Sequence, residues 1–169
     1  YSVALRLLLA MFCGGFIGFE RARKRRAAGF RTYLLVCLGA ALTMLLGQYE
    51  YQLLIGPWAE IAAGVGTRVD VARFGAQVIN GIGFLGAGTI IHSKGSVRGL
   101  TTAAALWCVA AVGLAIGIGL YLLAILGVLM IVLALWALDY LEDRIPKVRY
   151  RTVTIRRPWG PGVMADTVK

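Results

Sequence analysis

Hydrophobic residues fill long stretches of this 169-residue chain, and charged residues interrupt them only at intervals. The longest stretch without Asp, Glu, Lys, Arg or His is Gly99–Leu138, 40 residues, whereas one membrane-spanning helix needs about 20 residues. It therefore predicts two spans, divided by a short hinge at residues 117–119. Thr32–Tyr49 and Phe74–Ile91 are uncharged for 18 residues each, and Leu7–Phe19 for 13 residues. The pattern thus indicates five spans.

We predict from this pattern an all-α membrane protein of about five transmembrane helices. Arg6 lies inside the first span, from which its long side chain can reach the membrane surface. One transmembrane domain is expected over residues 1–145, followed at residues 146–169 by a basic cytoplasmic tail or the truncated start of a soluble domain. The expected spans are residues 2–20, 32–51, 70–91, 100–117 and 119–139.

Composition and charge support this class. The chain is 59% hydrophobic and 15% charged, which argues against a soluble globular protein. A net charge of +10 would suggest nucleic-acid binding in a soluble protein, but positively charged loops that remain in the cytoplasm explain it here. We therefore expect the lipid bilayer and no nucleic acid as a partner, with the N-terminus outside and the C-terminus in the cytoplasm. The basic residues of the alternate connections are Arg21, Arg23, Lys24, Arg25, Arg26 and Arg31, then Lys94 and Arg98, then Arg144, Lys147, Arg149, Arg151, Arg156 and Arg157.

The third expected span carries a polar stripe. Asp70, Arg73, Gln77 and Asn80 fall within roughly 80° of arc on a helix that turns about 100° per residue. One interpretation is a binding or conduction site at the outer mouth, with Asp70 as a weak candidate metal ligand, because polar groups inside a membrane usually face a cavity or a partner. The other is an Asp70–Arg73 pair at the helix end, with Gln77 and Asn80 bonded to neighbouring helices. The sequence leaves both open.

Four glycines follow this stripe in the sequence GIGFLGAG. The segment contains the dinucleotide-binding pattern GxGxxG, but that pattern needs a preceding strand and a βαβ unit, which an apolar membrane segment does not provide. We expect the glycines to allow close helix packing or to mark a discontinuous helix. They are Gly81, Gly83, Gly86 and Gly88.

The connection before the second expected span contains residues that differ from a loose run of charges. Gly29 permits a turn, and Thr32 can cap the following helix. Glu20 close to Arg21 and Arg31 suggests an ion pair at the cytoplasmic mouth, of a kind that contributes little at a surface.

The connection between the third and fourth expected spans is short and glycine-bearing. Gly99 gives a tight turn, and Thr101 or Thr102 can cap the fourth span, whose N-terminus could hold an anion. His92 is the single histidine of the chain, and one histidine cannot assemble a site.

Enzyme chemistry has no support in the sequence. No nucleophile, base and orienting group come together, and the three cysteines lack partners at metal-ligand spacing. We expect no enzymatic activity and no cofactor, while Mg²⁺ stays possible as a ligand or a substrate.

Three segments together resemble the MgtC/SapB family of bacterial membrane proteins: GFERARKRRAAGFRT, DVARFGAQVINGIGFLGAGTII and SVRGLTTAAALWCVAAVGLAIGIG. The resemblance implies a multi-pass protein of the bacterial plasma (inner) membrane, linked to growth in low magnesium, to acid adaptation and, in pathogens, to virulence. Some members of that family are described as acting on other membrane proteins, including ATP synthase, and many carry a small ACT-like domain after the spans, which we expect to be absent or truncated in this sequence. The residues it carries over are Glu20, Arg21, Gly29, Arg31, Thr32, Asp70, Arg73, Gln77, Gly81, Gly83, Arg98, Gly99, Thr101, Thr102 and Trp107.

Two functions compete at this point. A regulator would use glycine-bearing helix faces to contact itself, as a homodimer, or another membrane complex. An ion transporter or channel would use the polar face of the third span, and Mg²⁺, which keeps several waters, wants carboxylate oxygens there. Few carboxylates lie near the first three spans, so the regulator is favoured unless protomers combine.

Overall fold

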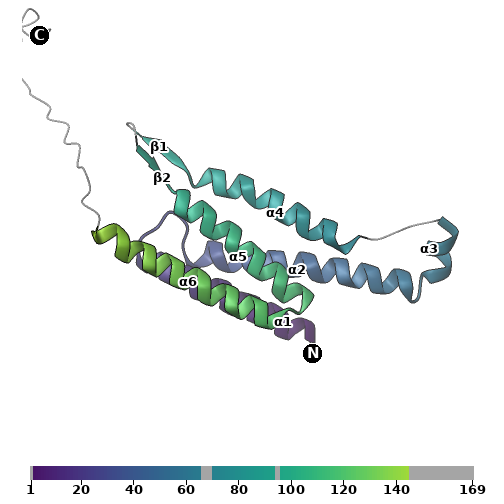
Figure 1. Ribbon diagram of the computed structural model, residues 1–169. Helices are drawn as coiled ribbons and strands as arrows, with labels where there is room; N and C mark the ends of the chain where they lie inside the picture. The colour runs from purple at the N-terminus through teal and green to yellow at the C-terminus, as the bar shows by residue number, and fades with distance from the viewer. Residues whose placement is uncertain (1, 66–69, 94–95, 145–169) are drawn as a thin grey trace, which may run out of the picture.

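Six helices and one β hairpin make up the part of the chain that the computed structural model describes, residues 2–65, 70–93 and 96–144 (Figure 1). The structure thus confirms a mainly helical protein. In chain order the elements are α1 (Ser2–Arg23), α2 (Phe30–Ile55), α3 (Ala59–Val65), α4 (Val71–Gly88), β1 (Ile91–Ser93), β2 (Ser96–Arg98), α5 (Leu100–Ile118) and α6 (Tyr121–Arg144).

Each of the five expected spans coincides with a helix. By length and composition, α1, α2 and α5 can cross a membrane, and α6 contains a shorter apolar stretch, Tyr121–Ala137. α4, at 18 residues, is not among the three. The chain is therefore a helical membrane protein, while the count of five spans and their orientation stay predictions.

Tight contacts of glycine with neighbouring backbone hold α1, α2 and α5 together. A Cβ placed on Gly113 of α5 would lie 2.3 Å from the carbonyl oxygen of Cys37 in α2, and one on Gly117 would lie 2.6 Å from that of Ala41. Likewise, a Cβ on Gly14 of α1 would lie 2.6 Å from the Cys37 Cβ in α2. Small residues allow this close approach of helices in lipid. α2 is therefore the central helix of the bundle.

α4 lies beside this bundle, against α5 and α2, with α1 and α6 on the other side (Figure 1). The hairpin β1–β2 joins α4 to α5, and it pairs Ile91 with Arg98 and His92 with Val97. The hairpin was not expected, and it corrects the all-α prediction. β-branched residues such as Ile91 and Val97 favour extended backbone, which explains why two short strands form here. Gly99 follows it at φ +94°, where a Cβ would lie 1.9 Å from the Thr89 carbonyl oxygen, so glycine is required there.

The two ends of the bundle carry different polar groups. We call the end with α3 and the α5–α6 turn the α3 end, and the end with the α1–α2 connection and β1–β2 the hairpin end. At the α3 end, the Arg6 Nη1 donates to the Gln48 Oε1 and to the Gly117 carbonyl oxygen, each at 2.8 Å, and the Arg6 Nε donates to the Tyr121 hydroxyl at 3.0 Å. Arg6 thus ties α1 to α2, α5 and α6 at this end of the bundle.

Candidate functional site

A pocket of about 550 Å³ opens between α2 and α4 at the α3 end. Three members of the predicted polar stripe, Asp70, Arg73 and Gln77, line it, and α2 contributes two polar side chains that the stripe did not include. The lining residues are Thr43, Glu50, Asp70, Arg73, Phe74, Gln77 and Val78. The structure therefore brings most of the stripe to one cavity.

Asp70 has a structural role at this pocket. It is the N-cap of α4, and its Oδ1 accepts a hydrogen bond of 3.0 Å from the Ala72 N–H. A carboxylate at this position satisfies one free N–H of the helix end and interacts favourably with the helix dipole. Although both residues are described, no ion pair joins Asp70 to Arg73, so the helix end is held by the cap instead.

The pocket lining differs from the predicted stripe at two residues, because it lacks Asn80 and includes Glu50. Asn80 is exposed on α4 and is not among the residues that line the pocket. Glu50 lies seven residues after Thr43 on α2, a spacing that returns to the same helix face and that could have revealed both residues. Across the described ranges, no three His, Cys, Asp or Glu side chains gather closely enough to hold a metal ion. Asp70 is thus placed beside a second carboxylate, but not in a metal-binding cluster.

The glycines of GIGFLGAG lie within one uninterrupted helix. α4 continues to Gly88, so the discontinuous helix is wrong. A Cβ on Gly86 would contact Ala103 of α5 at 3.4 Å, whereas one on Gly81, Gly83 or Gly88 would meet nothing within 4 Å. Gly81 also lines an apolar groove of about 370 Å³, whose residues are Leu35, Val36, Gly39, Ala40, Val78, Gly81, Ile82 and Leu85. Only one of the four glycines serves packing between the described helices.

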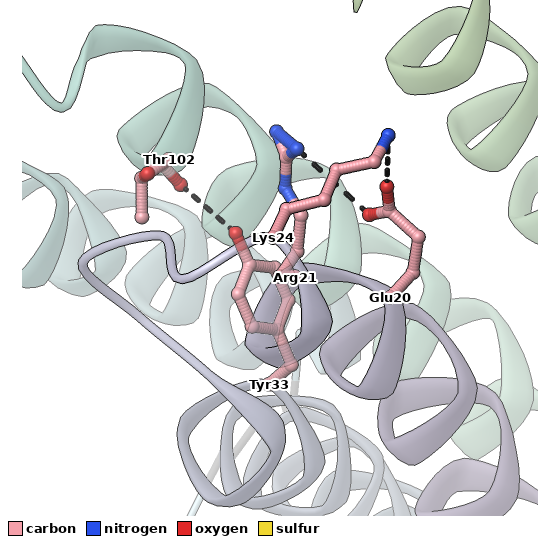
Figure 2. A network of polar contacts seen from close by, with 5 residues as sticks. All are labelled: Glu20, Arg21, Lys24, Tyr33 and Thr102. Carbon is pink, nitrogen blue, oxygen red and sulfur yellow. Dashed lines mark hydrogen bonds and ion pairs between the residues drawn. The ribbon is translucent and has the colours of Figure 1, made fainter.

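A second polar group lies at the hairpin end (Figure 2). Arg21 is fully buried there, and the Tyr33 hydroxyl, which lies close to its guanidinium, donates to the Thr102 carbonyl oxygen at 3.4 Å. Glu20 lies 2.5 Å from the Lys24 Nζ and 3.8 Å from the Arg21 Nη1. The predicted Glu20–Arg21 pairing is present, and Arg21 is more buried than a residue of a basic loop would be.

The caps expected at this end are wrong. The N-cap residues are Gly29 for α2 and Gly99 for α5, and neither helix receives a side-chain cap from Thr32, Thr101 or Thr102. Thr102 is buried beside Tyr33 instead. Glycine is accepted at an N-cap, where it costs only a few tenths of a kcal/mol relative to a residue with a capping side chain.

The remaining residues carried over by resemblance lie apart. Arg31 is exposed, and no ion pair links it to Glu20, although both are described. Arg98 is exposed in β2. Trp107 is 48% exposed on α5, beside a shallow apolar hollow between α5 and α6. The structure therefore places the predicted residues at three separate locations.

A family model for the MgtC family matches residues 7–144, which contain both polar groups and the whole of α4. The chain belongs to the MgtC family. The resemblance seen in the sequence is thereby confirmed, and in this MgtC-family chain the match includes all of α2 to α6 and α1 from residue 7 on.

Curated relatives of this MgtC-family chain come from several bacteria. "Putative magnesium transporter YhiD" of Escherichia coli K12 is 38% identical over 146 residues, which is 86% of this chain and 65% of the relative. "Protein MgtC" of Salmonella typhimurium LT2 is 40% identical over 135 residues, which is 79% of this chain and 51% of the relative. The chain spans about half to two thirds of the length of these relatives. No solved structure matches it.

Proposed function

We propose that this chain is a plasma-membrane protein of bacterial magnesium homeostasis that acts by helix contacts, with itself or with another membrane complex. The family match and the name of the Escherichia coli relative, a putative magnesium transporter, support the link to magnesium. The bilayer places the apolar helices in lipid, with the basic hairpin end in the cytoplasm.

The observation that carries the proposal is the contrast between the glycines. Those of α1 and α5 are used inside the bundle, where added Cβ atoms on Gly14, Gly113 and Gly117 would lie under 3 Å from α2. Gly81 of α4 and Gly39 of α2 border the apolar groove and meet nothing within 4 Å. Glycines at a lipid-facing groove permit the close approach of another helix. The α4 face that includes Gly81 and Gly88 is therefore the proposed contact surface.

The interior of the bundle supports the same function. Between Arg6 and Arg21, the buried side chains of α1, α2 and α5 include Cys13, Ile17, Cys37, Ala41 and Val109, and Gly113 brings the backbones of α5 and α2 into contact. Ions need water or polar oxygen along their path. The centre of a single protomer is therefore apolar and closely packed, which disfavours an ion path between α1, α2 and α5.

Ion passage is the second candidate. It is favoured by the pocket that Glu50, Asp70 and Gln77 line, since hydrated Mg²⁺ binds through one or two carboxylates. In this alternative, protomers would combine their pockets into a path along α4.

Oligomeric state tests the contact surface. We expect Gly81→Leu and Gly88→Leu to abolish the homodimer, measured by native mass spectrometry and by cross-linking in membranes. Gly83→Leu is the matched control, because Gly83 also faces open space but lies roughly 160° away around the helix. Equal loss of the dimer in all three variants, or a monomeric wild type in several mild detergents, would contradict the proposal.

Flux separates the two candidates. Purified protein in liposomes should pass no Mg²⁺, H⁺ or K⁺ above empty vesicles. Robust flux that Asp70→Asn or Arg73→Gln removes would exclude a pure regulator and favour ion passage.

A further inference from the structure

Arg21 presents a buried charge that the described residues do not satisfy. Its side chain is 1% exposed, and none of its three guanidinium nitrogens has a hydrogen-bond partner among them. A buried guanidinium without hydrogen bonds is costly, and such groups are normally paired. This position therefore calls for an anion with several acceptor oxygens.

Glu20 supplies this anion only in part. Its carboxylate lies 3.8 Å from the Arg21 Nη1, beyond hydrogen-bond distance, and 2.5 Å from the Lys24 Nζ (Figure 2). The Glu20 carboxylate thus lies between two cations, and it forms no hydrogen bond with the guanidinium of Arg21. The local charge of Glu20, Arg21 and Lys24 together is +1.

The first turn of α5 adds donors on the other side of Arg21. Tyr33 links the two, since its hydroxyl lies close to the guanidinium and bonds to Thr102 in that turn. The first N–H groups of a helix have no partner within the helix, and the N-cap Gly99 has no side chain to offer. Such a helix end favours negative charge.

We propose that the hairpin end binds a phosphate group between Arg21, Lys24 and the first turn of α5, with Glu20 as the competing anion. The planar fork of arginine matches two phosphate oxygens, and lysine is a common second partner. The phosphate belongs either to the headgroup of an anionic lipid at the membrane surface or to a soluble phosphate compound. The site lies at the opposite end of the bundle from the Asp70 pocket and does not depend on the proposed function.

Thermal stability of the purified full chain in a neutral detergent tests the site. One arm titrates inorganic phosphate against sodium chloride of the same ionic strength, and the other compares micelles containing phosphatidylglycerol with micelles containing phosphatidylcholine. We expect Tm to rise in the phosphate arm if the ligand is soluble and in the phosphatidylglycerol arm if it is a lipid. A rise in neither arm overturns the proposal.

Variants show whether the effect belongs to this site. Glu20→Gln removes the competing anion, so it should lower the half-saturating concentration about tenfold. Arg21→Gln should abolish the rise in Tm, whereas Arg23→Gln, an exposed residue of the same helix end, should keep it. Equal loss in Arg21→Gln and Arg23→Gln overturns the site. If Arg21→Gln does not fold, Glu20→Gln decides, and an unchanged half-saturating concentration in that variant overturns the proposal.

Discussion

Gly113→Ala adds one methyl group where α5 and α2 are in backbone contact. The new Cβ would lie 2.3 Å from the Cys37 carbonyl oxygen and 2.9 Å from the Ala40 Cβ, so the two helices must separate. Overpacking costs roughly 1 to 3 kcal/mol, and the upper part of this range applies because backbone atoms cannot rotate away. The helix propensity that alanine gains over glycine, about 0.8 to 1 kcal/mol, offsets part of this cost and leaves a net loss of roughly 1 to 2 kcal/mol. We therefore expect a clear loss of stability from a single methyl group.

The buried thiols of the same interface measure this loss. In a Cys108→Ser background, the remaining thiols are Cys13 and Cys37, which are 5% and 0% exposed. They react with a maleimide dye only after the helices open, so a net loss of roughly 1 to 2 kcal/mol should speed labelling about 5- to 30-fold. Gly83→Ala, where nothing lies within 4 Å, should label at the parental rate or more slowly. Parental labelling of Gly113→Ala, or equal acceleration in Gly83→Ala, would refute the packing argument.

Two further predictions concern the α3 end, and both are checked by thermal unfolding in mild detergent. Asp70→Ala should lower stability by about 1 kcal/mol because α4 loses its N-cap. Asp70→Asn keeps a capping oxygen and should match the wild type. Equal destabilisation by both variants would show that the charge of Asp70 matters more than its cap. Arg6→Met should lower the free energy of unfolding by roughly 2 to 3 kcal/mol. Tyr121→Phe removes one of the Arg6 hydrogen bonds and should lower it by about 1 kcal/mol. An Arg6→Met variant as stable as the wild type would contradict the role of Arg6 in joining the helices.

The helices could be located from the sequence because uncharged runs of sufficient length have few alternatives in a membrane chain. Hydrocarbon requires every backbone group to be bonded within the segment, so an apolar run of spanning length becomes a helix. The described helices begin and end within a few residues of the expected spans. The hairpin could not be predicted, because strands of three residues show almost no alternation of polar and apolar positions.

The roles of individual glycines could not be predicted. Gly113 and Gly81 both lie in apolar segments, yet one touches the backbone of a neighbouring helix and the other meets nothing within 4 Å. The difference depends on which helices become neighbours, and that is a property of the whole bundle. Spacing alone therefore identifies surfaces that can pack closely, but not which of them do.

The burial of Arg21 could have been predicted from the spacing of residues along α1, although its charge pointed to an exposed position. It stands in a basic run that the positive-inside rule explains, so the charge pattern gives no reason to expect its burial. Yet Ala10, Gly14, Ile17 and Arg21 follow one face of α1 at helical spacing, and all four are buried. Continuing the apolar face past the end of the span would have separated Arg21 from its exposed neighbours.

The apolar interior between Arg6 and Arg21 also determines how the protein responds to voltage. A membrane potential does work only on charge that moves through the field, about 2.3 kcal/mol per elementary charge per 100 mV. The middle of each long helix lacks Asp, Glu, Lys and Arg, and the basic groups lie at the two ends of the bundle. Rearrangement of these helices would therefore carry almost no gating charge, and the conformational balance of a protomer in an energised membrane would be close to that in a depolarised one.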